Sequence, residues 1–168
     1  MSHANVQTID KGAATPIDFV REISTPISTN ELPIAEFGLA VRLGTFNNFV
    51  TITGTVGIIS GPIFTPSFDT IVLRIYRRNT IPPSDLVKVF ELHQGLLGAG
   101  KPTLTTFSFT DGGADGPVVP IGYHAYTLSV HRQQGIVGDF IAPLDDPAPL
   151  IIGPIQFEGT SYTTNITP

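Results

Sequence analysis

The sequence has no cysteine and no tryptophan, and it contains a single methionine. Without cysteine, neither a disulfide framework nor a thiolate metal site can form. The chain does not require such support, because a domain of 168 residues removes about 70% of its unfolded surface from water on folding. The absence of cysteine is compatible with any redox compartment. We therefore expect one domain held together by an ordinary hydrophobic core.

Charged residues are scarce as well. Asp, Glu, Lys and Arg make up 14% of the chain, against about 25% in an average soluble domain. The net charge is −5 and there is no basic stripe with interleaved aromatic residues, so the pattern argues against nucleic acid as a partner. Low charge together with 17 glycines and 15 prolines is more typical of coat, capsid or fibre subunits than of enzymes.

Long apolar runs are also missing. The first residues have neither the basic nor the apolar segment of a secretory signal peptide. No uninterrupted apolar run approaches the roughly 18 residues that a membrane-spanning helix requires. The sequence predicts no membrane span and no classical secretion signal.

What the sequence does contain is alternation of apolar and polar residues with a period of two, the signal of a half-buried strand. The stretch 68–78 shows it most clearly and predicts a central strand. Its inward face is apolar and consists of Ile71, Leu73 and Ile75. Its outward face is mixed and consists of Val72, Arg74 and Tyr76. We interpret this outward face as a candidate subunit interface.

Further segments have the alternation or the β-branched and aromatic content of strands. They are residues 34–43, 49–59, 86–92, 103–110, 123–132, a short edge segment at 136–141, and 150–163. Glycine- and proline-rich turns separate them, and no segment of useful length has helical periodicity. The prediction is an all-β fold, a single jelly-roll-like β-sandwich of about eight strands over residues 34–168.

Residues 1–33 differ from the rest of the chain. Three prolines in this stretch disfavour helix. Two interpretations remain open: a disordered tail, or an extended arm that adds a strand to the sheet edge of a neighbouring subunit. The arm is favoured because a disordered tail should contain fewer apolar residues. Those expected to form the subunit contact are Ile17, Phe19, Val20 and Ile23.

No metal site is indicated. The histidines are His3, His93, His124 and His131, and none has zinc-site spacing. In a regular strand the last two would point to opposite faces. The loop from Asp111 to Asp115 resembles a calcium loop only in part, because glycine replaces an oxygen ligand at position 113, and the pair Asp145–Asp146 is no stronger. We predict no metal and no cofactor.

No catalytic group is indicated either. Ser108, His124 and Asp111 are of the types found in nucleophilic catalysis, but no local nucleophile motif supports them. The acidic residues are scattered through loops, so no glycosidase-like carboxylate pair can be chosen. The sequence therefore predicts that the protein is not an enzyme.

Four stretches in order resemble a known family. They are Leu-Arg-Ile-Tyr-Arg at 73–77, Phe-Ser-Phe-Thr-Asp at 107–111, Gly-Tyr-His-Ala-Tyr-Thr-Leu-Ser-Val at 122–130, and Ile-Gly-Pro-Ile-Gln-Phe-Glu-Gly-Thr at 152–160. They are similar to small jelly-roll spore-surface proteins of spore-forming Gram-positive bacteria, of the exosporium protein C type. The resemblance implies a component made in the mother cell without a signal peptide and assembled around the spore. It transfers no catalytic residues.

The leading expectation is a structural, self-assembling subunit of a bacterial spore-surface layer or of an extracellular fibre or appendage. Its partners would be copies of itself, as a homo-oligomer or filament, together with other spore-surface proteins. The alternative is a carbohydrate-binding or adhesive module in which Tyr76, Tyr123 or Tyr162 stacks on sugar rings, although the absence of tryptophan counts against it. A small metal enzyme of the cupin type would need a histidine cluster that the sequence does not show.

Overall fold

The computed structural model describes residues 3–16, 25–42, 47–61, 70–81, 83–96, 98, 100–112, 118–133, 136–137, 140–141 and 148–167. Within these ranges the chain forms strands and their connections, and no helix occurs. Consequently, no helix in the described ranges is long and apolar enough to cross a membrane. The predicted all-β class is confirmed.

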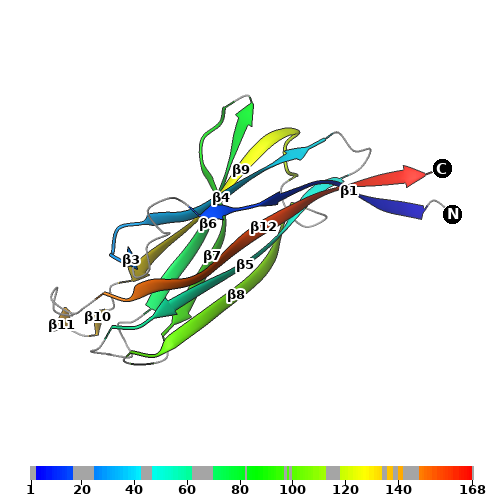
Figure 1. Cartoon of the computed structure of the whole chain (residues 1–168). Helices are drawn as coiled ribbons and strands as arrows, with labels where there is room; N and C mark the ends of the chain where they lie inside the picture. The colour runs from blue at the N-terminus through cyan, green and yellow to red at the C-terminus, as the bar shows by residue number, and fades with distance from the viewer. Residues whose placement is uncertain are drawn as a thin grey trace.

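Two antiparallel sheets face one another (Figure 1). Sheet I has the order β1 (His3–Ala13), β12 (Leu150–Thr167), β5 (Asn47–Ile59) and β8 (Pro102–Gly112), with the short β3 (Thr25–Pro26) also paired to β12. Sheet II has the order β2 (Thr15–Pro16), β4 (Leu32–Val41), β9 (Gly122–Gln133), β6 (Thr70–Ile81) and β7 (Val87–Gly95). A small separate hairpin consists of β10 (Ile136–Val137) and β11 (Phe140–Ile141).

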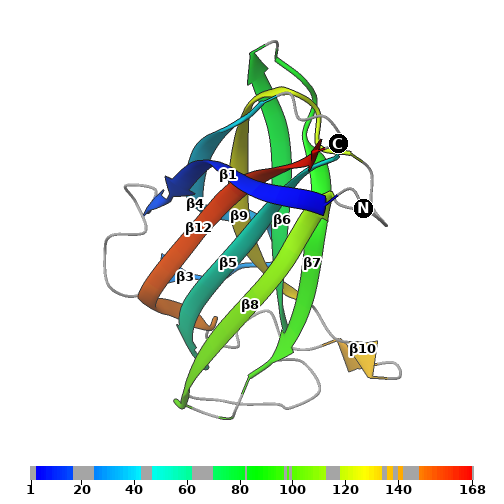
Figure 2. The same ribbon diagram turned by 90° about the vertical axis from the view of Figure 1, so that its right-hand side faces the viewer.

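The order of the eight long strands is that of a jelly roll. Numbered along the chain, they run first–eighth–third–sixth in sheet I and second–seventh–fourth–fifth in sheet II. The predicted jelly-roll-like sandwich is therefore confirmed, and the view in Figure 2 shows sheet I in front of sheet II.

The first strand of the jelly roll comes from the stretch that the sequence assigns to an arm. Residues 3–13 form β1, which pairs with β12 of the same chain almost along its whole length. Nor do the sheets break at residue 33, since β2 pairs with β4 and β3 pairs with β12. The sequence did not predict β1 as a strand of this domain, because its apolar and polar residues do not alternate cleanly. Its register with β12 also shifts between Thr8 and Asp10.

The predicted inward faces form the core. Ile71, Leu73 and Ile75 of β6 are buried between the sheets. The same holds for the inward residues of β5 and β9, which are Val50, Ile52, Val56, Ile58, Tyr126, Leu128 and Val130. Phe37 stacks on Tyr126 with ring centroids 5.3 Å apart and also contacts Phe157 at 4.7 Å. This apolar layer holds the two sheets in place.

Two glycines allow the sheets to close along one side. Gly12 and Gly159 lie opposite one another in the β1–β12 register. A Cβ atom on Gly12 would lie 2.5 Å from the carbonyl oxygen of Gly38, and one on Gly159 would lie 2.5 Å from a Phe37 ring carbon. The close approach lets the Asp10 carboxylate accept a hydrogen bond from the Ala40 amide at 2.8 Å, so β1 is bonded to both sheets.

Candidate functional site

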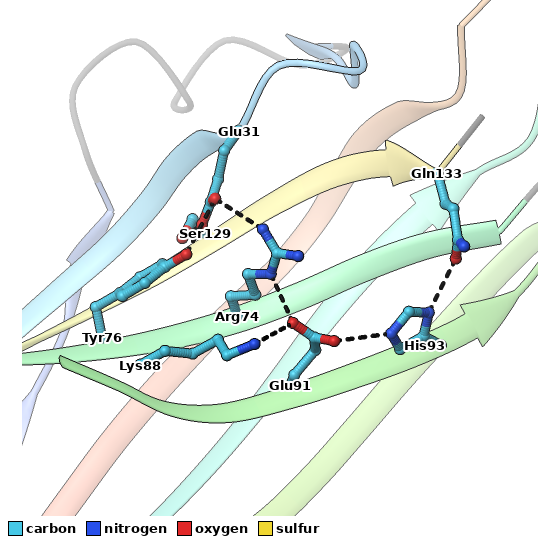
Figure 3. A network of polar contacts seen from close by, with 8 residues as sticks. All are labelled: Glu31, Arg74, Tyr76, Lys88, Glu91, His93, Ser129 and Gln133. Atoms are coloured by element: carbon cyan, nitrogen blue, oxygen red, sulfur yellow. Dashed lines mark hydrogen bonds and ion pairs between the residues drawn. The ribbon is translucent and has the colours of Figure 1, made fainter.

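A network of polar side chains covers the outer face of sheet II (Figure 3). Glu91 on β7 is one centre of this outer-face network. Its Oε2 accepts hydrogen bonds from Arg74 Nε and from Lys88 Nζ, both at 2.8 Å, and its Oε1 lies 3.0 Å from His93 Nε2. His93 Nδ1 in turn lies 2.9 Å from Gln133 Oε1 on β9.

Glu31, immediately before β4, is the other centre. Its Oε2 accepts hydrogen bonds from Tyr76 Oη at 3.1 Å and from Arg74 Nη1 at 3.2 Å. Its Oε1 accepts one from Ser129 Oγ at 2.7 Å. Arg74 therefore bridges the two carboxylates, and the network joins β6, β7, β9 and the start of β4.

The network fixes the charge states of its carboxyl groups. Hydrogen bonds from Lys88, His93 and Arg74 lower the pKa of Glu91 to about 2. Burial alone would raise the pKa of Glu31, but the hydrogen bonds from Ser129, Tyr76 and Arg74 together hold it below its usual value. Both groups are ionised at neutral pH, so neither can donate a proton as a general acid.

A shallow groove of about 510 Å³ lies beside the network. Its lining consists of Glu31, Pro33, Glu36, Tyr76, Arg78, Leu86, Thr127 and Ser129. Thr127 Oγ1 donates to Glu36 Oε2 at 2.7 Å, and Arg78 Nη2 lies 3.5 Å from the same oxygen. Each of the six polar lining residues therefore already has a partner within the lining, which does not favour the sugar-binding alternative.

The predicted interface strand maps onto this face with one important difference. Arg74 and Tyr76 lie together because both bond to Glu31. Val72, however, is only 1% exposed, because it lies between His131 of β9 and His93 of β7 in the cross-strand register. The outward side of β6 was expected to be an amphipathic strip, but its exposed part is a polar network that does not include Val72.

Several residues singled out from the sequence lie outside the described ranges. These are the arm residues Ile17, Phe19, Val20 and Ile23, and the loop residues Asp115, Asp145 and Asp146.

The three residues of catalytic type do not come together. Ser108 is exposed on the outer face of sheet I, whereas Asp111 and His124 are buried. Asp111 Oδ2 accepts hydrogen bonds from Arg77 Nη1 at 2.6 Å and from Tyr126 Oη at 2.8 Å. The carboxylate thus joins strands of both sheets inside the sandwich instead of orienting a histidine.

The described histidine side chains, those of His93, His124 and His131, lie in different environments. His124 points into the core and His131 lies on the outer face, as the strand periodicity predicts. His124 Nε2 is 2.7 Å from the carbonyl oxygen of Pro120, so Nε2 carries the proton. Over the described ranges, no three His, Asp or Glu side chains are grouped so that they could hold a metal ion.

The edge of sheet I formed by β8 is long and has no outward charge that would hinder pairing with another strand. The edge strand β8 has 11 residues and pairs with β5 without a register shift, and no described strand pairs with its other side. Its one charged residue, Asp111, points inward to Arg77. The edge strand of sheet II differs, since β7 carries Lys88 and Glu91 and its register with β6 shifts after Ile75. Charges and bulges of this kind protect sheet edges from pairing.

The fold and these surfaces define a jelly-roll β-sandwich with a polar outer face and an unprotected edge. The solved chains to which it is similar include one described as "Structure of infectious bursal disease virus Gx strain", with a TM-score of 0.39 and 11% identity. That match covers 96% of this chain, which spans 40% of the viral chain. Another is described as "CBM4 structure and function", with a TM-score of 0.25, 11% identity and 94% of each chain covered. Neither similarity bears on function. No protein-family model and no curated protein sequence matches the chain.

Proposed function

We propose that the protein is a structural subunit that assembles with copies of itself into a layer or fibre, and that it has no enzymatic activity. The motif resemblance to spore-surface jelly-roll proteins supports a place on the spore surface or in an extracellular appendage, with other spore-surface proteins as further partners. The carboxylates of Glu31 and Glu91, which Arg74 bridges, also fit a structural role, because both are ionised at neutral pH and neither can act as a general acid.

The single observation that carries the proposal is the edge strand β8. A long, regular edge without outward charge offers a row of backbone groups to which another chain can add a strand. Its exposed side chains are Pro102, Leu104, Thr106, Ser108 and Thr110, which are apolar or uncharged. In this proposal the strand that adds to it comes from the stretch between β2 and β3 of the next copy, at Ile17, Phe19, Val20 and Ile23.

A pair of matched lysine substitutions tests the proposal. Ser108 on β8 and Thr53 on β5 are directly opposite one another, and both are exposed on the outer face of sheet I. Ser108→Lys places a charge on the free edge, whereas Thr53→Lys places the same charge one strand further inside. We expect Ser108→Lys to abolish assembly of the full chain in negative-stain electron microscopy and Thr53→Lys to leave it largely intact.

Both variants should remain folded, because exposed substitutions usually change stability by about 0.5 kcal/mol or less, and circular dichroism checks this. Equal assembly of the two variants would show that β8 is not the edge on which subunits add.

A further inference from the structure

The two ends of the sandwich have different shapes. The β6–β7 hairpin extends beyond the neighbouring strands at one end (Figure 1, Figure 2). Of the eight exposed large apolar side chains among the described residues, six gather at this end. They are Ile81, Leu86 and Val87 on the hairpin, Val118 and Ile121 just before β9, and Tyr123 in β9. A grouping of this kind on a soluble chain marks an interaction surface.

Hydrogen bonds connect the described residues of the hairpin tip to one another and to β9. The Ser84 amide donates to the carbonyl oxygen of Asn79 at 2.9 Å, and the Asn79 amide donates to Ser84 Oγ at 2.7 Å. Thr80 Oγ1 donates to the carbonyl oxygen of Tyr123 at 2.9 Å, which ties the hairpin to β9. The hairpin backbone that carries the exposed apolar side chains is thus held before any contact forms, so less backbone entropy is lost on association.

The opposite end contains an apolar hollow of about 390 Å³. It lies at the start of β8, whereas the hairpin lies beyond the end of β8, where Asp111 reaches Arg77 of β6. Its lining is almost entirely apolar and consists of Pro26, Ile59, Ser60, Gly61, Gly100, Ala148 and Leu150. The rim is preformed, because the Gly100 amide donates to the carbonyl oxygen of Gly61 at 3.0 Å and the Ile27 amide donates to that of Pro149 at 2.8 Å.

The two ends also carry residues of opposite charge. Asp85 is exposed on the hairpin tip beside Leu86, and Lys101 is exposed beside Gly100 on the rim of the hollow. Within the part of the chain that the structure describes, neither residue takes part in an ion pair. One end of the molecule is therefore an apolar projection with an acidic residue, and the opposite end is an apolar hollow with a basic residue.

We propose that the hairpin tip of one copy docks into the hollow of the next copy, with Ile81, Leu86 and Val87 in the hollow and Asp85 paired with Lys101. The contact joins two different surfaces, so it propagates from copy to copy instead of closing as a two-fold dimer does. This inference rests on the proposed function and adds an axial contact to the strand addition along β8.

Removal of the apolar tip tests the contact on the full chain. The double variant Leu86→Ser/Val87→Ser should raise the critical concentration for assembly, measured by light scattering, by about tenfold or more, because it removes two apolar side chains that the contact would bury. Val118→Ser is the matched control, since Val118 is 56% exposed at the same end but is not on the hairpin. It should leave the critical concentration unchanged.

Charge reversal tests the orientation of the contact. Asp85→Lys and Lys101→Asp should each weaken assembly, and the variant carrying both changes should restore it. Fibres or layers that form equally well from wild type and from every one of these variants would overturn the docking contact while leaving self-assembly in place. A wild-type chain that stays monomeric would instead contradict the proposed function itself.

Discussion

His124 is the clearest case of a residue whose environment determines its behaviour. Its side chain is 1% exposed, and its Nδ1 has no hydrogen-bond partner. Burial lowers its pKa below the usual 6.5, and the nearby charge of Arg77 acts in the same direction, against the hydrogen bond to Pro120 and the charge of Asp111. The neutral imidazole is therefore part of the folded state.

A pH dependence of stability follows from this depressed pKa. Below about pH 6.5 the unfolded chain protonates His124 more readily than the folded chain, so this residue should reduce the free energy of unfolding as the pH falls, by at most about 1.4 kcal/mol per pH unit. When the pH is lowered from 7.5 to 5, we expect the free energy of unfolding to fall less for His124→Gln than for the wild type, as measured by urea denaturation.

The other groups that titrate in this range are present in both the wild type and the variant. Their contributions therefore cancel when the two pH profiles are subtracted. They include His131, whose pKa is lowered by burial, and His93, whose pKa is raised by its contact with Glu91. Parallel pH profiles of the wild type and the variant would show that His124 does not contribute.

At the scale of elements, the pair Arg77–Asp111 joins β6 of one sheet to β8 of the other. The side chains are 10% and 5% exposed, and the contact is 2.6 Å long. Both are therefore largely removed from water, where an unpaired charge is costly.

Removal of one partner should be strongly destabilising. We expect Asp111→Ala to lower the free energy of unfolding by about 3–5 kcal/mol in urea denaturation, because it leaves Arg77 and the Tyr126 hydroxyl without their acceptor. Asp85→Ala is the control, since Asp85 is exposed and should change stability by about 0.5 kcal/mol or less. A loss of similar size in both variants would contradict the role assigned to the buried pair.

Periodicity accounts for the strands that could be predicted. The strands β5, β6 and β9 alternate cleanly because one face of each is buried in the core. The strand β1 could not be recognised, because its residues are mostly polar and its position depends on pairing with β12, about 150 residues away in the chain. Hydrophobic alternation reports burial of a face, and edge strands with little burial do not show it.

The outer-face network could not be predicted for a related reason. Glu31 bonds to Arg74 and Tyr76, which follow it by 43 and 45 positions, and to Ser129, which follows it by 98. Those contacts depend on the register between strands, which one sequence does not reveal. Arg74 and Tyr76 were recognisable as outward residues of β6, but their carboxylate partners were not.

At the scale of the whole molecule, the sheet edges differ from one another, and so do the two ends of the sandwich. In this jelly roll the edge strand β8 has no outward charge whereas the edge strand β7 is charged, and the two ends are an apolar projection and an apolar hollow. The proposed contacts along β8 and between the ends would run in different directions, so together they would build a layer or a fibre.

The most direct test of self-assembly is negative-stain electron microscopy of the purified full chain over a wide range of concentrations. The account predicts monomers at low concentration and ordered fibres or sheets with a regular repeat above a critical concentration. Particles of the 17.9 kDa monomer alone at every concentration would contradict it.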